Sequence, residues 1–276
     1  MNIALGLATN EGSAADLALN GYLGTLWFPS KLSLLDISIP VVLGRKPAGL
    51  SSFSRGGPRE YRSVPVLDEV EERVRQTWAA SRRRHSSILS RFVSEAERVG
   101  AAIRDAPDPQ AVGFSIAALA RAQGITLCQT GDADLVKELH LDSALTEAGI
   151  GLVAGPSPEA IVRAGIGVTR AVLGVAETGS ILVHLDEVDA RLLSMLSEIH
   201  VALLHQDAMV DSLEEGLLLS RYLILKSQAR GQPSYLSWVT GPSRTADIER
   251  MLTIGVHGPR ELHVFLLPPT GNAFLS

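Results

Sequence analysis

Hydrophobic residues recur at every fourth position near residue 70. The run consists of Val66, Val70, Val74 and Trp78. This spacing is typical of one face of a helix, which we predict over residues 66–80, with Pro65 directly before it as a start signal. A second helical pattern covers residues 88–99. We expect residues 66–99 to form lead-in helices ahead of the main domain.

Beyond residue 100 the pattern changes to short apolar runs that alternate with helical spacings. The apolar runs predict strands at residues 101–103, 125–128, 150–154, 181–184, 200–204, 235–240 and 261–267. The helical spacings predict helices at residues 108–122, 132–139, 143–148, 157–164, 170–176, 189–196, 211–225 and 244–254. Strands separated by such helices indicate an α/β fold with a mostly parallel, open sheet and helices on both faces. We therefore assign residues 100–276 to one α/β domain.

Residues 1–65 carry a weaker pattern. They are rich in Gly, Ser, Ala and Leu, with a strand-like run at 37–43 and a helix-like run at 14–19. Residues 51–58 are rich in Ser, Gly and Arg and read as a linker. We expect residues 1–65 to be an N-terminal extension of unknown structure.

The densest run of chemistry-capable residues is 239–267. It is predicted to form a strand, a turn at Gly241, a helix, a second turn at Gly255 and a further strand. Ser243 is the expected N-cap of the helix, and Thr245 is the alternative. The buried face of that helix would carry Ile248, Met251 and Leu252.

A helix that begins at this turn would create a site for an anion. The first N–H groups of a helix are unpaired and lie at its positive end. Gly241 and Ser243 are small enough to let a ligand approach, and Arg244 offers a planar pair of donors. Thr245 and Asp247 would lie in the first turn beside them. The alternative is that Ser243 only caps the helix and Arg244 is a solvated surface residue.

A second stretch with candidate chemistry is Ala176–Val183, A-E-T-G-S-I-L-V. Glu177 stands at the mouth of a predicted strand, followed by Thr178 and the turn residue Gly179, which we expect to bind the ligand. A carboxylate there can act as base, nucleophile or hydrogen-bond acceptor. The alternative is a solvated turn carboxylate.

The histidines do not indicate a metal site, because no H-E-x-x-H pair or comparable ligand spacing occurs. His257 differs from the others because it lies between Gly255 and Gly258, close to the expected anion site, and we expect Gly258 to bind the ligand. An imidazole there can act as acid or base near neutral pH. It can equally serve as a loop hydrogen-bonder.

Three runs of residues carry a family resemblance. They are T-G-P-S-R-T-A-D-I-E, G-V-H-G-P-R-E-L-H-V and A-E-T-G-S-I-L-V, and together they resemble the lactate-utilisation (LUD) domain family, in particular its protein C branch. The resemblance spans about Arg98 to Leu267. It implies a fold similar to the NagB/RpiA/CoA-transferase group, some of whose enzymes have a catalytic glutamate in a place similar to that of Glu177. It also implies a role in bacterial oxidation of L-lactate to pyruvate beside iron–sulfur partner subunits.

Composition limits what this chain can contribute to such a system. Cys128 is its single cysteine, so it forms no intramolecular disulfide and cannot supply the roughly four thiolates of an iron–sulfur cluster. We expect no cofactor on this chain and iron–sulfur clusters only on partner chains. Cys128 itself lies in a run that reads as a buried strand.

Charge and hydropathy exclude other classes. The 276 residues carry a net charge of −5, which gives no reason to expect binding to nucleic acid or anionic membrane. No segment reaches the roughly 18 apolar residues of a membrane span, and the N-terminus lacks the basic region of a secretory signal. We expect a cytoplasmic protein.

Two functions stay open on the sequence. The first is a non-cluster accessory component of L-lactate oxidation, which binds an organic anion, a cofactor or a partner subunit at the carboxyl edge of the sheet. The second is a stand-alone enzyme or sensor that binds a sugar phosphate or an acyl-CoA. In either case we predict that Glu177 and Arg244 face one shared pocket.

Overall fold

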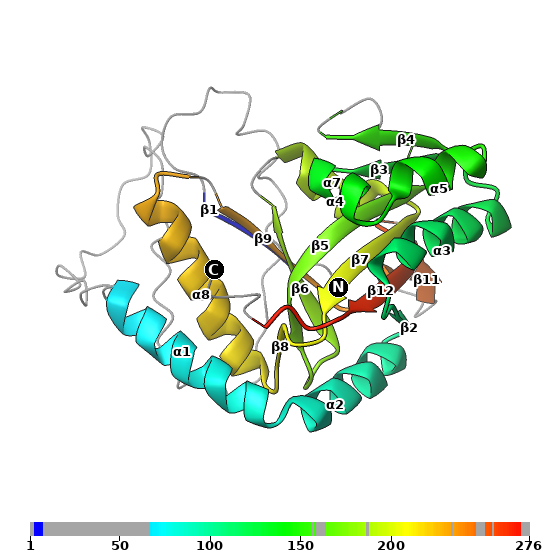
Figure 1. Ribbon diagram of the computed structural model, residues 1–276. Coiled ribbons are helices and arrows are strands. Elements are labelled where there is room, and N and C mark those ends of the chain that lie inside the picture. Colours follow the sequence, from blue (N-terminus) through cyan, green and yellow to red (C-terminus); the bar gives the residue numbers. More distant parts are fainter. Residues whose placement is uncertain are drawn as a thin grey trace. The chain divides into compact units, whose positions relative to one another are not determined.

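A mixed, mostly parallel β-sheet organises the described part of the chain (Figure 1). The computed structural model describes residues 3–7, 67–155, 157, 164–185, 188–232, 234–246, 252–255 and 257–271. All belong to the compact unit formed by residues 1–8 and 65–276. The elements predicted at 14–19, 37–43 and most of 157–164 lie outside the described residues, as does the predicted N-terminal extension apart from Ile3–Leu7.

The described residues form helices and strands with the following bounds. The helices are α1 (Leu67–Arg83), α2 (His85–Arg98), α3 (Pro109–Ala122), α4 (Ala133–Glu138), α5 (Leu141–Glu147), α7 (Val188–Leu196) and α8 (Leu213–Ala229). The strands are β1 (Ile3–Leu7), β2 (Ala102–Asp105), β3 (Leu127–Thr130), β4 (Gly151–Ala154), β5 (Ile166–Val175), β6 (Ser180–Leu185), β7 (Ile199–His205), β8 (Met209–Val210), β9 (Ser234–Val239), β10 (Arg244–Ala246), β11 (Leu252–Ile254) and β12 (Glu261–Leu267). None of these helices is both long and apolar enough to cross a bilayer.

The main sheet has ten strands and is built around β5. Its principal order is β1-β9-β6-β5-β7-β12-β2, and β3, β4 and β8 pair beside this path. The first part of β5 pairs in parallel with β7 and β3, whereas its last part pairs antiparallel with β6. β5 therefore joins a parallel half of the sheet to an antiparallel half. The predicted α/β class with a mostly parallel sheet is confirmed.

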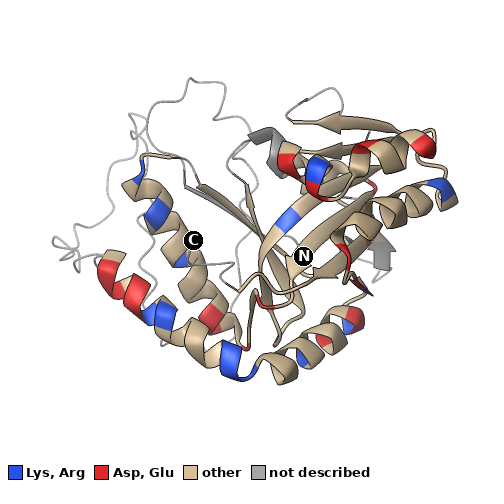
Figure 2. Cartoon of the chain, viewed as in Figure 1, with Lys and Arg blue, Asp and Glu red and all other residues tan. Residues whose placement is uncertain are grey.

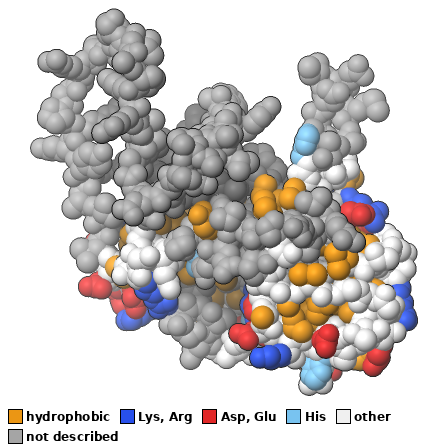
Figure 3. Space-filling model, turned by 90° about the horizontal axis from the view of Figure 1, so that it is seen from above, with side chains coloured by type: hydrophobic (Ala, Val, Ile, Leu, Met, Phe, Trp, Pro, Cys, Tyr) orange, Lys and Arg blue, Asp and Glu red, His pale blue; other side chains and the backbone are white. Residues whose placement is uncertain are grey.

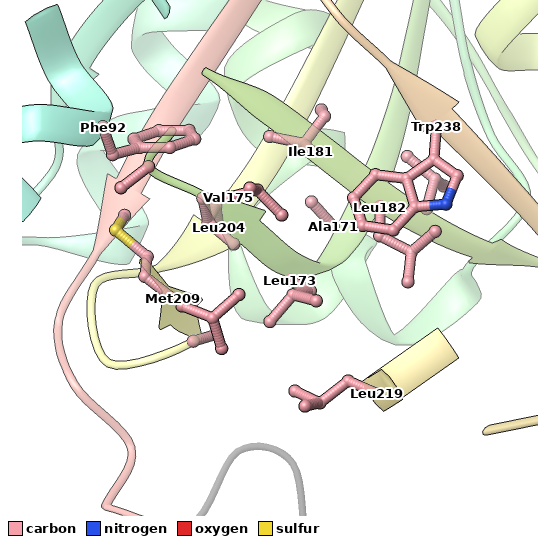
Figure 4. Packing of buried hydrophobic residues seen from close by; sticks show 14 of the residues in the cluster. Phe92, Ala171, Leu173, Val175, Ile181, Leu182, Leu204, Met209, Leu219 and Trp238 are labelled. Atoms are coloured by element: carbon pink, nitrogen blue, oxygen red, sulfur yellow. The ribbon is translucent and has the colours of Figure 1, made fainter. Parts of the chain in front are cut away.

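Both faces of the sheet are buried. In β7, Val201 and Leu203 belong to one hydrophobic cluster, and Ala202 and Leu204 belong to the other. The larger cluster is covered by α1, α2 and α8, and the smaller by α3, α4 and α5, on the other side (Figure 1). In the larger cluster, Phe92 of α2, Met209 of β8, Leu219 of α8 and Trp238 of β9 surround the strand residues Leu173 and Leu182 (Figure 4). Burial on both faces explains why these strands are continuous apolar runs.

Several elements begin and end where the sequence predicts. The helix predicted at 108–122 is α3, with Asp108 as its N-cap: the carboxylate accepts from Gln110 N at 2.9 Å, and Pro109 follows in the first turn. The strand predicted at 261–267 is β12. The helices predicted at 66–80 and 88–99 correspond to α1 and α2, but α1 ends three residues later and α2 begins three residues earlier than predicted. Cys128 is fully buried in β3, as expected for a small apolar side chain.

The helix predicted at 170–176 is wrong, because these residues continue β5. Val172 and Val175 are β-branched, as are Val168 and Thr169 directly before the predicted helix, and such residues favour strands. A short apolar run does not distinguish a buried strand from a buried helix by its spacing alone. The partner strands β6, β7 and β8 decide the outcome, and they come later in the chain.

Candidate functional site

The two stretches with candidate chemistry lie together in the structure. β6 begins at Ser180 beside the end of β9, with Ile181 opposite Val239. The hydroxyls of Ser180 and Thr240 are 2.7 Å apart, and the Thr178 hydroxyl donates to Ser180 Oγ at 2.7 Å. β9 runs in the same direction as β5, so the turns that contain Thr178 and Gly241 leave the carboxyl ends of these two strands.

Both turns pack against the C-terminal half of α2 through a glycine. Gly179 has φ +63°, and a Cβ at this position would overlap the backbone of Ala96. Gly241 has φ +72°, and a Cβ there would overlap the carbonyl oxygen of Val99. Positive φ strains any residue with a Cβ. These two predicted ligand-binding glycines thus have a structural reason to be glycine. We call the region formed by Thr178, Gly179, Gly241, Ser243 and Arg244 the signature surface. Arg244 is its exposed member and Thr178 is half-buried, whereas the two glycines and Ser243 are buried.

Arg244 contacts the end of α2. Its Nη2 donates to the Val99 carbonyl at 2.6 Å, and its guanidinium lies so close to Gly100 that a side chain there would have to displace it. The last carbonyls of a helix lack partners within the helix and lie at its negative end. Arg244 is exposed and provides one of the missing donors together with a positive charge.

Replacing Arg244 by alanine is expected to lower the free energy of unfolding by about 1 kcal/mol, because a charged donor to Val99 is lost. Arg244→Lys keeps a charged donor and is the matched control, expected to lose less than half as much. Urea denaturation followed by circular dichroism measures both. An Arg244→Ala chain as stable as the wild type would contradict the capping role.

The prediction of a helix that begins at Ser243 is wrong where the structure describes this segment. Residues 244–246 form β10, which pairs antiparallel with β11, so that Arg244 lies opposite Ile254. Thr245, Thr253 and Ile254 are β-branched and favour this hairpin. Ser243 N donates to Pro259 O at 2.8 Å, and its own carbonyl accepts from Gly255 N at 3.0 Å. Its hydroxyl therefore caps no helix.

This correction changes the chemistry expected of the signature surface. Without a helix N-terminus at Ser243, no helix dipole or row of free N–H groups attracts an anion there. Thr245 lies in β10, whereas Asp247 lies outside the described residues. Arg244 is the charged group that the hairpin places beside the turn at Gly241. A phosphate bound at this position would therefore lack the helix N-terminus that the sequence predicted for it.

Glu177 lies at the N-terminus of α8. Its Oε2 accepts from the backbone N–H of Leu213, the first residue of that helix, at 2.8 Å. The exposed carboxylate thereby pairs with a free donor at the positive end of the helix. The neighbouring Asp211 binds Arg84 and Arg91, each at 2.7 Å, and ties the same end of α8 to the junction of α1 and α2.

His257 and Gly258 lie in the loop between β11 and β12, where the His257 side chain is exposed. The loop touches the signature surface through Pro259, which accepts from Ser243 N. Two hollows are described: about 360 Å³ between α3 and α5, and about 90 Å³ at the end of β2. Neither is lined by Glu177 or Arg244. A pocket shared by these two residues stays a prediction.

An ion cluster that the sequence did not indicate lies at the carboxyl end of β3. Arg170 pairs with Asp132 at 2.7 Å and with Glu138 at 2.6 Å. Burial alone would lower the pKa of Arg170, but hydrogen bonds and charges from Glu138 and Asp132 outweigh it and raise that pKa. Arg170 lies in β5, so the helix predicted at 170–176 gave no indication of this cluster.

Part of the chain is similar in sequence to known proteins. It is 33% identical over 106 residues to Lactate utilization protein C of Deinococcus radiodurans, covering 38% of this chain and 47% of that protein. It is 34% identical over 101 residues to Lactate utilization protein C of Anoxybacillus flavithermus, covering 37% and 43%. The chain thus spans about half the length of the curated relatives that it matches. The crystal structure of a DUF162 family protein from Deinococcus radiodurans superposes with a TM-score of 0.44 at 23% identity, covering 66% of this chain and 98% of that one.

The family comparison covers more of the chain. The LUD domain matches residues 89–267, from the second turn of α2 to the end of β12. The match includes both turns of the signature surface and the helix on which they pack. With more than half of its residues matched, the chain belongs to the LUD domain family.

Proposed function

We propose that this chain is a component of a bacterial system that oxidises L-lactate to pyruvate, and that it works beside partner subunits that carry iron–sulfur clusters. The support is the match to the LUD domain over residues 89–267 together with the curated relatives, whose printed names refer to lactate utilisation. The observation that carries the proposed site is the hydrogen bond between Ser180 and Thr240, which joins the two family-like turns.

The proposed division of labour follows from the chemistry of the reaction. Conversion of L-lactate to pyruvate removes two electrons and two protons, so an electron acceptor is required. Cys128 is the single thiol of this chain, and burial raises its pKa to about 12, which keeps it protonated. Cluster ligation needs several thiolates. We therefore assign electron transfer to partner subunits and the binding of an organic anion to this chain.

The signature surface is the proposed place of binding. A guanidinium has five N–H donors in a planar fork, and the bond to Val99 uses one of those of Arg244. A carboxylate such as that of L-lactate matches the fork in shape and charge. Thr178 and Thr240, whose hydroxyls bind Ser180 in the adjoining turn, are the further proposed contacts, and Glu177 is the proposed acid or base. His257, on the adjoining loop, is the proposed proton donor or orienting group.

Growth on L-lactate tests the role. A strain from which this chain has been deleted is expected to grow on pyruvate but not on L-lactate, and the intact chain supplied in trans should restore growth. Growth on pyruvate is the control, because pyruvate is the product and enters metabolism after the proposed step. Undiminished growth of the deletion strain on L-lactate, with no second copy of the gene, would overturn the proposal.

A further inference from the structure

The hollow between α3 and α5 lies apart from the proposed site. Its floor is lined by the small residues Ala117, Ala118, Ala144 and Ala148, and its volume is about 360 Å³. Phe114 stands at its edge with 52% of the residue exposed. We call this hollow and its edge the α3–α5 groove. A phenyl ring beside a cavity floored by alanines places a projection and a complementary recess on one patch.

The outer face of α3 is also unusual for a surface helix. Its exposed positions include Ala111, Phe114, Ala118 and Ala122, which follow one another at helical spacing. Arg121 is the one charged residue of α3, near the C-terminal end of the helix (Figure 2). A surface helix normally presents charged and polar residues to water. Here Gln110, Ser115 and Arg121 are the exposed polar residues of α3, and the exposed Phe114 and alanines between them are typical of an interaction surface.

Two opposite charges border the groove. Arg121 is held in place on α5 because its guanidinium donates to the carbonyls of Glu147 and Ala148, at 3.0 Å and 3.3 Å. Glu147, on the last turn of α5, contributes an exposed carboxylate to the lining. Figure 3 views the molecule from above Figure 1 and shows hydrophobic side chains gathered on that face, with acidic and basic side chains around them. The groove thus combines an apolar centre with a rim of both signs.

We propose that the α3–α5 groove binds a second copy of this chain. A two-fold interface uses the same patch on both subunits, so the patch must be complementary to itself. Here Phe114 of each copy enters the alanine-floored recess of the other, and Arg121 of each copy lies opposite Glu147 of the other. A partner of different sequence would need only one of these features, a projection or a recess. The presence of both, with both charges, favours a second copy.

The first test is the mass of the full chain by light scattering over a concentration series. The wild type is expected to be a dimer. Ala118→Glu fills the recess that Phe114 of the other copy enters and places a carboxylate against that ring, so it is expected to weaken dimerisation by about 100-fold or more. Leu196→Glu is the matched control: Leu196, on α7, is 53% exposed and does not line the groove, so this variant should dimerise as the wild type does.

The second test uses the charges at the rim. Arg121→Glu and Glu147→Arg should each dimerise poorly alone, because each places like charges opposite one another across the two-fold axis. Mixed in equal amounts they should form a heterodimer, since both rim contacts then pair opposite charges. Circular dichroism verifies that Arg121→Glu keeps its helices.

Three results would overturn the proposal. They are a wild-type chain that stays monomeric up to about 100 μM, where even weak self-association is populated; an Ala118→Glu chain that dimerises as the wild type does; and no heterodimer in the mixture of charge variants. A monomer that binds a partner subunit through this groove would give the first of these results.

Discussion

Replacing Gly179 by alanine is expected to lower the free energy of unfolding by about 3 kcal/mol or more. The residue has φ +63°, and holding alanine in that conformation costs about 1–2 kcal/mol. The new Cβ would also overlap backbone atoms of Ala96 and Glu95 in α2. Unlike the end of a flexible side chain, these backbone atoms cannot move aside. Overpacking against fixed neighbours costs about 1–3 kcal/mol more.

Gly231→Ala is the matched control for this experiment. Gly231 has nearly the same φ, +64°, but an added Cβ there meets nothing within 4 Å. Gly231→Ala should therefore lose only the free energy that positive φ costs an alanine, about 1–2 kcal/mol. Urea denaturation of both variants gives the two free energies, and their difference isolates the contact between the turn and α2. Equal losses in the two variants would contradict the close packing of the turn at Gly179 on α2.

Lowering the pH from 6.5 toward 4 is expected to cost the chain about 3 kcal/mol through His200 alone. This histidine is fully buried in β7, and burial lowers its pKa from 6.5 to about 4. Thr169 Oγ1 lies 2.8 Å from its Nε2, whereas its Nδ1 has no hydrogen-bond partner among the described residues. A positive charge in this position would not be compensated.

The sign of the pH dependence follows from linkage. Between pH 4 and pH 6.5 the unfolded chain binds a proton at His200 and the folded chain does not, so stability falls as the pH falls. The stabilising contribution is complete above pH 6.5. Unfolding free energies measured at several pH values for the wild type and His200→Gln should show a smaller slope in the variant. An NMR titration of the native histidine tests the same point without mutation, and a native pKa near 6.5 would contradict it.

The sequence predicted elements whose signals are local. Asp108 and Pro109 mark the start of α3 because the cap and the first turn involve only neighbouring residues. The end of β5 and the β10–β11 hairpin were mispredicted because their conformation depends on partner strands far along the chain. In these short segments the spacing of apolar residues fits a helix and a strand equally well.

In the candidate site, too, local patterns identified residues, whereas contacts with distant parts of the chain were not predicted. Sequence patterns pointed to both Gly179 and Gly241 as special positions, but not to the reason. Both pack on α2, and no spacing along the chain relates residues 96–99 to these distant turns. The roles of Arg244 as a cap on α2 and of Glu177 as a cap on α8 also depend on tertiary contacts. Residues that cap helices in this way can still bind a ligand with their remaining donors or acceptors.

The most direct test of the proposed site is the rate of L-lactate oxidation supported by Glu177→Gln. Glutamine keeps a carbonyl oxygen that can accept from Leu213 N, so α8 stays capped while the acid or base is lost. We predict a free energy of unfolding lowered by at most about 1 kcal/mol, because the charge at the positive end of α8 is lost. We predict a rate reduced about 100-fold, within the range of general acid–base catalysis. A fully active variant of normal stability would contradict a catalytic role for Glu177 and leave it as a helix cap.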